Sequence, residues 1–160
     1  MCNMQYLDLS NNKIGSAGIT ALATAVGSGA LDKLQMLYLN NNQIGDEGMK
    51  AFAAASGSLG ALKALGLNGN QIGDAGMSAL ARAIGAGAMP RLIELLLDSN
   101  LIGDVGIDAL ANTLRSSQEL LLTSLTHLYL AKNRIGDDGM KALADALTDG
   151  ALPKVTPETI

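Results

Sequence analysis

The 160-residue chain contains few aromatic residues, one cysteine and one histidine. Aromatic residues make up 2% of the composition, with no Trp and a single Phe, so Leu, Ala, Ile and Met must fill any core. Cys2 cannot form an internal disulfide, which is expected of a protein from a reducing, cytoplasmic compartment. His127 has no cysteine or histidine near it in the sequence, whereas a zinc site needs three or four such ligands. We therefore expect no metal site, and we expect no cofactor.

Long hydrophobic runs and excess positive charge are also missing. No apolar run approaches the ~18 residues of a membrane helix, and the first residues show neither the basic nor the apolar region of a signal peptide. The net charge is −4, from 11 Lys and Arg against 15 Asp and Glu. This balance disfavours nucleic acid as a partner. Apolar residues reach 48% of the chain, which is too hydrophobic for a disordered protein. The composition predicts one globular domain that binds neither membrane nor nucleic acid.

An internal repeat dominates the sequence. The motif Asn-x-Ile-Gly occurs five times, and L-x-x-L-x-L, with Met for the first Leu in the first copy, precedes each occurrence. The motifs begin at Asn12, Asn42, Asn70, Asn100 and Asn133. Self-similarity at a period of about 30 residues is typical of solenoids. We expect five units at about 4–33, 34–61, 62–91, 92–124 and 125–154, and a partial sixth unit at 155–160.

Each unit combines a strand pattern with a helix pattern. The L-x-L alternation predicts a strand with one buried face, and apolar residues at i, i+3, i+4 and i+7 predict a helix after it. The Asn is expected to bond backbone groups as a ladder from unit to unit. The position after Ile-Gly is expected to be the helix N-cap, and it is occupied by Ser16, Asp46, Asp74, Asp104 and Asp137. Left-handed C-caps are expected at Gly27, Gly57 and Gly85. Gly18, Gly48, Gly76, Gly106 and Gly139 predict close packing of each helix against neighbouring backbone.

The full pattern, L-x-x-L-x-L-x-x-N-x-I-G-[DS]-x-G-x-x-A-L-A-x-A, resembles the leucine-rich repeat of the ribonuclease-inhibitor type over about residues 4–155. The resemblance implies an α/β solenoid, a right-handed horseshoe with parallel strands on its concave face and helices on its convex face. It also implies a protein-binding function without catalysis. Members of this family include cytosolic inhibitors, sensor domains of innate-immune receptors and GTPase-activating proteins. The fourth unit departs from the pattern, because Ser116–Ser124 expands it.

Every second strand residue is expected to point away from the buried leucines onto the concave face. All three tyrosines fall there, and Tyr is frequent at binding hot spots because it offers a rigid surface with a polar tip. Strands also favour Tyr for structural reasons, so both interpretations stay open. The small residues Ala64 and Gly66 predict a shallow groove between flanks that carry Tyr. The partner-binding residues that we predict are Tyr6, Asp8, Met36, Tyr38, Asn40, Asn68, Glu94, Leu96, Asp98, His127 and Tyr129.

Three other functions are weighed against binding by the concave face. Neither end of the chain carries an obvious capping unit, which favours a fragment of a larger repeat protein or self-association of the terminal units. A GTPase-activating module is a third hypothesis, by analogy of fold only. An enzyme is disfavoured, because the one acid–base couple expected on neighbouring strands, His127 with Glu94, has no nucleophile beside it. The partner is expected to be an unknown protein or peptide.

Overall fold

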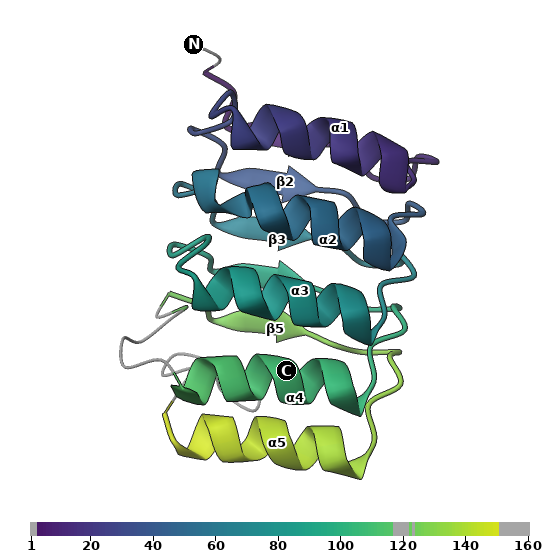
Figure 1. Ribbon diagram of the computed structural model, residues 1–160, viewed down its shortest axis with the longest axis vertical. Coiled ribbons are helices and arrows are strands. Elements are labelled where there is room, and N and C mark those ends of the chain that lie inside the picture. Colours follow the sequence, from purple (N-terminus) through teal and green to yellow (C-terminus); the bar gives the residue numbers. More distant parts are fainter. Residues whose placement is uncertain (1–2, 117–121, 123, 151–160) are drawn as a thin grey trace.

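Five strands and five helices alternate along the chain in the computed structural model, which describes residues 3–116, 122 and 124–150. The helices stack in one layer and the strands lie behind them in a second layer (Figure 1). The elements in chain order are β1 (Tyr6–Asp8), α1 (Ser16–Gly27), β2 (Met36–Tyr38), α2 (Gly45–Ala55), the 3-10 turn η1 (Ser56–Ser58), β3 (Ala64–Gly66), α3 (Asp74–Gly85), β4 (Glu94–Leu96), α4 (Asp104–Ser116), β5 (His127–Tyr129) and α5 (Asp137–Thr148).

The strands form one parallel sheet in the order β1-β2-β3-β4-β5. Equivalent residues pair across it without any shift, so that Leu7, Leu37, Leu65, Leu95 and Leu128 form one row. A parallel connection needs a crossover, and the helix of each unit supplies it on the same side of the sheet. The architecture is the predicted α/β leucine-rich-repeat solenoid. We call the sheet surface opposite the helices the concave face.

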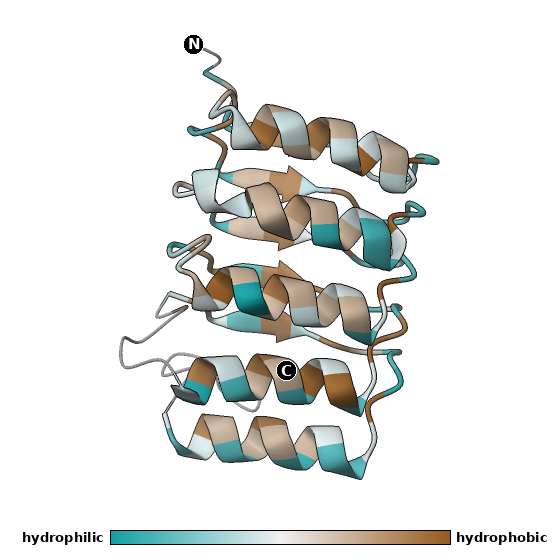
Figure 2. Ribbon diagram, viewed as in Figure 1, coloured by the Kyte–Doolittle hydropathy of each residue, from teal (hydrophilic) through white to brown (hydrophobic). Residues whose placement is uncertain are grey.

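The leucines of the repeat fill the space between sheet and helices. In units two to five all twelve Leu positions of L-x-x-L-x-L are buried. The helices also contribute buried apolar residues to this core, among them Ile19, Met49 and Ile107. The outward sides of the helices, which face the viewer in Figure 2, mix hydrophobic and polar colours. Unit five departs from the predicted helix pattern: Met140 is exposed, whereas Leu143 and Ala146 are buried. The equivalent Met77 of α3 is fully buried, because α4 packs on α3.

The asparagines of the repeat form the predicted ladder beneath the turns. Asn100 is buried, and its Nδ2 donates to the carbonyls of Leu67 and Leu97 at 2.9 and 3.0 Å. Its Oδ1 accepts the N–H groups of Asn70 and Ile72, both at 3.0 Å. Such bonds satisfy backbone groups that would otherwise be buried without partners, and they tie one unit to the unit before it.

The prediction that Ser16, Asp46, Asp74, Asp104 and Asp137 are N-caps of their own helices was wrong. Gly15, Gly73 and Gly136 occupy the N-cap positions of α1, α3 and α5, Ile44 occupies that of α2, and none of these four makes a side-chain cap bond.

Asp46, Asp74 and Asp104 instead cap the helix of the following unit. Asp46 Oδ1 accepts the N–H groups of Gly73 and Gly76 at 2.7 and 2.9 Å, where α3 begins. Asp74 binds Gly103 and Gly106 in the same way, and Asp104 accepts Gly136 N–H at 2.6 Å. A carboxylate at a helix N-terminus satisfies free donors and meets the positive end of the helix dipole. Here that carboxylate comes from the neighbouring repeat.

This capping explains the glycine one turn inside the helices. A Cβ on Gly76 would lie 2.7 Å from Asp46 Oδ1 and 3.1 Å from Met49 Cβ, and Gly106 has equivalent neighbours in Asp74 and Met77. A Cβ on Gly139 would lie 3.0 Å from Asp104 Cα. The predicted close packing against neighbouring backbone is therefore present at Gly139 and also at Gly48, where an added Cβ would lie 3.2 Å from Ser16 Cα. At Gly76 and Gly106 the packing is equally close but against side chains. At Gly18 the prediction was wrong, because the atoms near an added Cβ belong to Ile14 of the same unit.

The predicted C-cap glycines were also misplaced. Gly27 and Gly85 end their helices without a positive φ, and Gly57 lies in η1. The left-handed glycines that follow α1 and α3 lie two residues beyond Gly27 and Gly85, at Gly29 and Gly87, with φ of 78° and 87°.

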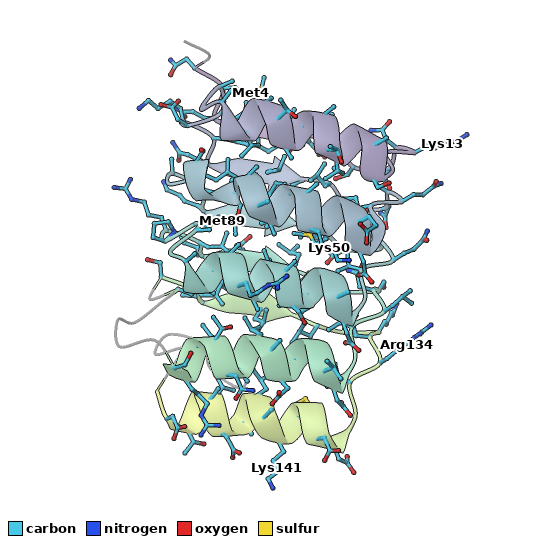
Figure 3. All side chains as sticks on the ribbon, viewed as in Figure 1. Met4, Lys13, Lys50, Met89, Arg134 and Lys141 are labelled. Carbon is cyan, nitrogen blue, oxygen red and sulfur yellow. The ribbon has the colours of Figure 1, made fainter. Side chains whose placement is uncertain are left out.

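Two regions that the sequence analysis singled out lie outside the described residues. These are most of the fourth-unit expansion at 116–124 and the partial sixth unit at 155–160. Among the labelled basic side chains, Lys13, Arg134 and Lys141 extend away from the stack (Figure 3). They are exposed, as solvated charges are expected to be.

Candidate functional site: the concave face of the sheet

Alternate strand residues place three rows of side chains on the concave face, because successive side chains of a strand point to opposite sides of the sheet. The register sets Tyr6, Met36, Ala64, Glu94 and His127 in one row, and Asp8, Tyr38, Gly66, Leu96 and Tyr129 in the next. Ser10, Asn40, Asn68, Asp98 and Ala131 follow the strands in a third row. The structure therefore places all eleven predicted partner-binding residues on one surface, whereas their binding role stays a prediction.

Apolar side chains are exposed on this surface to different degrees. Tyr6 is 55% exposed, Met36 39% and Tyr129 37%, whereas Tyr38 and Leu96 are half-buried. The next leucines of the same strands, Leu37 and Leu95, are buried on the helix side. Burial on one face and exposure on the other follow from the two-residue period of the strand. Large apolar side chains on the exposed face are unfavourable in water, and the core does not need them for its packing.

The predicted groove at the middle strand is largely filled by a neighbouring ring. A Cβ on Gly66 would lie 2.6 Å from Tyr38 Cδ1, so the Tyr38 ring lies over this glycine. The same ring meets Tyr6 edge-on, with 5.9 Å between centroids. A hollow remains beside Ala64, towards the start of the strands. It has a volume of about 270 Å³ and is lined by Met36, Tyr38, Lys63, Ala64, Ile93 and Glu94. We call it the apolar hollow.

His127 does not form the couple with Glu94 that the sequence suggested. Its Nδ1 lies 2.8 Å from Thr126 Oγ1, and its ring stacks on Tyr129 with 6.0 Å between centroids. The hydrogen bonds and ion pairs of the described residues include none between His127 and Glu94. His127 and Tyr129 thus form an aromatic surface on β5, and His127 is not paired with Glu94 for acid–base chemistry.

A polar trough of about 530 Å³ crosses the carboxyl ends of the strands. A chain of short bonds fixes its floor: Asn40 Oδ1 accepts Asn68 N–H at 3.0 Å, Asn68 Oδ1 accepts Asp98 N–H at 2.8 Å, and Asp98 Oδ1 accepts Ala131 N–H at 2.7 Å. These bonds use one oxygen of each side chain. Asn68 Nδ2 and Asp98 Oδ2 carry no hydrogen bond to the described residues, which leaves a donor and an acceptor in the trough.

Sequence reasoning missed the outer rim of the trough. Its lining includes Asn11, Asn41, Ser99 and Lys132, which were not among the predicted site residues. These residues follow the third row directly, and all adopt a left-handed conformation with φ between 55° and 58°. Asn is among the few residues that tolerate this conformation. The Asn-Asn pairs that begin at Asn11 and Asn41 could therefore have predicted a tight turn, in which the chain changes direction after each strand.

Three carboxylates, Asp8, Glu94 and Asp98, give the concave face a negative field. None of them forms an ion pair with the described residues; the ion pairs found join Asp32 to Lys33, Glu47 to Lys50 and Asp149 to Arg115. Burial raises the pKa of Tyr38, and the charge of Glu94 and Asp8 contributes to the same rise. Hydrogen bonds from Ser10 lower the pKa of Asp8. The face is thus acidic around a partly apolar centre.

Family models match three stretches of the chain. The model described as leucine rich repeats in two copies matches residues 2–47. A second model, described as a leucine rich repeat, matches residues 62–81 and 122–144. Together with the five strand–helix units, these matches decide the family. The chain is a leucine-rich repeat protein. Such domains are generally modules that bind other proteins and are typically not enzymes, and no curated protein sequence matches this chain.

Several solved structures are similar to this chain. Actin-binding site 2 of leiomodin-1 superimposes with a TM-score of 0.65 at 23% identity, covering 83% of this chain and 75% of that chain. A chain from the octameric complex of latrophilin 3, Unc5D and FLRT2, whose named repeat component is FLRT2, gives a TM-score of 0.49 at 23% identity, covering 88% of this chain and 37% of that one. An internalin from Listeria monocytogenes gives 0.43 at 20% identity, covering 89% of this chain and 45% of the other. At these identities the likeness to leiomodin-1 shows the fold alone.

Within 3–116, 122 and 124–150, no helix has the length and apolar character to span a membrane. The same residues hold no group of three or more His, Cys, Asp or Glu side chains arranged to hold a metal ion.

Proposed function

We propose that this protein is an interaction module that binds a protein loop or a peptide on the concave face. The observation that carries the proposal is the pairing of exposed apolar side chains, Tyr6, Met36 and Tyr129, with polar groups held in fixed positions along the trough. Binding sites commonly combine a rigid aromatic anchor with placed hydrogen-bonding groups. A binding role is also the general function of leucine-rich repeat domains.

The size of the surface favours a small epitope. Five strands at ~4.8 Å spacing span roughly 20–25 Å, and each exposes about 15–17 Å of length, which gives a flat area on the order of 400 Å². A standard protein interface buries about 800 Å² on each partner. A peptide or an extended loop therefore suits the described sheet better than a large flat surface. The ribonuclease-inhibitor subtype and a cytoplasmic location belong to the same proposal, supported by the repeat pattern and by the single cysteine.

The test compares two double variants with equal changes of charge. Met36→Lys with Tyr129→Lys alters the concave face, whereas Thr20→Lys with Val105→Lys alters exposed positions on the helices. After equal far-ultraviolet circular dichroism has been verified, each protein is used to capture partners from lysate of the source cells. We expect a partner that the wild type and the helix variant retain and the concave variant loses. Equal retention by all three would place the binding surface elsewhere.

Assembly through the terminal units is the second candidate function. Met4 on the first unit and Met140 on the fifth are exposed, and a hollow of about 310 Å³ lined by Leu130, Ile135 and Met140 lies where a further repeat would pack. Within the stack, the equivalent surfaces are covered by neighbouring repeats. Light scattering over a hundredfold range of concentration tests this function, since stacking of copies predicts a mass that rises with concentration and a constant monomer mass would contradict it.

A further inference from the structure

The concave side of β4 differs from that of the other strands. β4 presents Glu94 and Leu96, and Asp98 follows two residues after Leu96, so that an apolar side chain stands between two carboxylates. The paired positions on the neighbouring strands are not acidic: β3 contributes Ala64 and Gly66, and β5 contributes His127 and Tyr129. Of the described strands, this is the one where charge and apolar surface alternate in this way.

Each carboxylate of this set borders a separate hollow. Glu94 lines the apolar hollow together with Met36, Ala64 and Ile93. Asp98 lines the polar trough, where its Oδ1 holds Ala131 N–H at 2.7 Å and its Oδ2 carries no bond to the described residues. Leu96 stands between the two hollows, paired across the sheet with Gly66 and with the exposed Tyr129. Because Asp98 is already fixed by Ala131, the direction of its second oxygen is set before any ligand arrives.

The spacing of the set matches that of an extended chain. Residues two apart on a strand are separated by about 6.6–6.8 Å, so Glu94 and Asp98 lie about 13 Å apart. An extended ligand has the same repeat, and its alternate side chains reach one surface. A ligand with basic residues at i and i+4 and an apolar residue at i+2 therefore meets Glu94, Leu96 and Asp98 in register.

The charges and shapes of the two hollows complete the match. A long basic side chain lays its methylene stem along apolar surface and keeps its charged head in contact with polar groups, as the apolar hollow beside Glu94 allows. At the other end, a guanidinium donates in a planar fork and suits the carboxylate of Asp98. Lys63 and Lys132, the cations nearest these hollows, line their rims and form no ion pair with Glu94 or Asp98.

We propose that the concave face selects an extended basic segment, with two Arg or Lys residues four positions apart and an apolar residue midway, which lies along β4 over Glu94, Leu96 and Asp98. The inference rests on the proposed function, because it names the partner chemistry of that same face. It disfavours acidic segments, since these would bring like charges towards Asp8, Glu94 and Asp98, none of which has an ion-pair partner among the described residues.

The experiment measures binding of labelled synthetic peptides to the full chain by fluorescence anisotropy. The probe peptide carries Arg-Ser-Leu-Ser-Arg within a Gly-Ser flank. A second peptide places the two arginines side by side with unchanged composition, and a third replaces both arginines by glutamate. We expect the probe to bind at least tenfold more tightly than either control peptide, and its affinity to fall as ionic strength rises.

Variants then assign the site. Glu94→Gln and Asp98→Asn each remove one negative charge and keep the shape, and Asn at position 98 can still accept Ala131 N–H. We expect each to weaken binding of the probe about three- to tenfold, and Leu96→Ser to weaken it for the spaced peptide more than for the adjacent-arginine peptide. Glu47→Gln on α2 is the charge-matched control, because Glu47 is exposed on the opposite side of the molecule and pairs with Lys50; we expect no change.

The outcomes separate this inference from the proposed function. Binding of the adjacent-arginine or glutamate peptide as tightly as the probe, with loss in Met36→Lys/Tyr129→Lys, would overturn the inference and leave the concave face as the binding surface. Probe affinity unchanged by Glu94→Gln and Asp98→Asn would also overturn it, as would no binding of the probe at millimolar protein. Partner capture that persists in Met36→Lys/Tyr129→Lys would contradict the proposed function itself.

Discussion

The two sides of the same short strands follow different rules. On the helix side, units two to five carry Leu at every repeated position, and all twelve are buried. On the concave side, equivalent positions hold residues as different as Met36, Ala64, Glu94 and His127. The helix side must pack against the next repeat, which restricts it to one shape. The concave side meets no other part of the described chain, and so its composition is free to serve a partner.

Neighbouring leucines on β4 test this contrast most strongly. Leu95 is buried on the helix side, whereas Leu96 is half-buried on the concave side. Leu95→Ala is expected to lower the free energy of unfolding by about 2–5 kcal/mol, because it removes apolar burial and leaves a cavity. Leu96→Ala is expected to cost about 1 kcal/mol or less. Urea denaturation of both variants measures the difference, and equal losses would contradict the separation of roles.

The asparagine ladder gives the next largest effect and an internal comparison. Asn100 makes bonds through both its Oδ1 and its Nδ2. Asn70 uses its Nδ2, but its Oδ1 is buried without a partner among the described residues, where α2 begins early at Gly45 with a φ of +62°. Orphaned buried groups cost about 1–3 kcal/mol each. Asn100→Ala should therefore destabilise the protein by about 1 kcal/mol more than Asn70→Ala, as measured by urea denaturation. The reverse order would show that the ladder is not the source of this stability.

Capping between repeats is expected to contribute less. Asp74 holds two N–H groups at the start of α4, whereas Asp137, at the equivalent position in α5, is exposed and accepts no bond from the described residues. Asp74→Ala is expected to cost about 1 kcal/mol, within the range for loss of a cap. Asp137→Ala should cost a few tenths. The midpoint of thermal unfolding, Tm, is measured for both variants. A similar decrease in Tm for both would contradict the capping role of Asp74.

Substitutions on the concave face should change stability least. Met36→Lys/Tyr129→Lys is expected to alter the free energy of unfolding by about 0.5 kcal/mol or less for each site, as is usual for exposed positions. The same urea titration measures it against Thr20→Lys/Val105→Lys. A loss above about 2 kcal/mol would mean that the exposed aromatic and Met side chains belong to the core.

The repeat itself made most of the fold predictable. The Leu and Asn positions indicated strand, buried face and ladder, because each role admits few residue types and recurs five times. The aspartates were assigned to the wrong helices because a repeated position can contact its own unit or the next one. Asp46 follows Ile44-Gly45 in the sequence, but in space it lies beside Gly73 of the next unit. Sequence spacing alone cannot distinguish the two helices that one side chain reaches.

The sequence predicted where the candidate site lies, but not the shape of its surface. Strand alternation placed Tyr38 and Gly66 on the concave face, but only packing revealed that the Tyr38 ring lies over Gly66 and leaves the hollow beside Ala64. The trough depends on left-handed turns at Asn11, Asn41 and Ser99, which follow from backbone geometry rather than from apolar periodicity. Residues without a repeated pattern, such as His127, carried no signal for their contacts.

One side of the strands stabilises the solenoid, and we propose that the other side binds a partner. Partner capture and the free energy of unfolding, measured on the same preparation of Met36→Lys/Tyr129→Lys, test this division of roles together. We expect capture to be lost while stability stays within about 1 kcal/mol of the wild type. Retained capture at unchanged stability would contradict it.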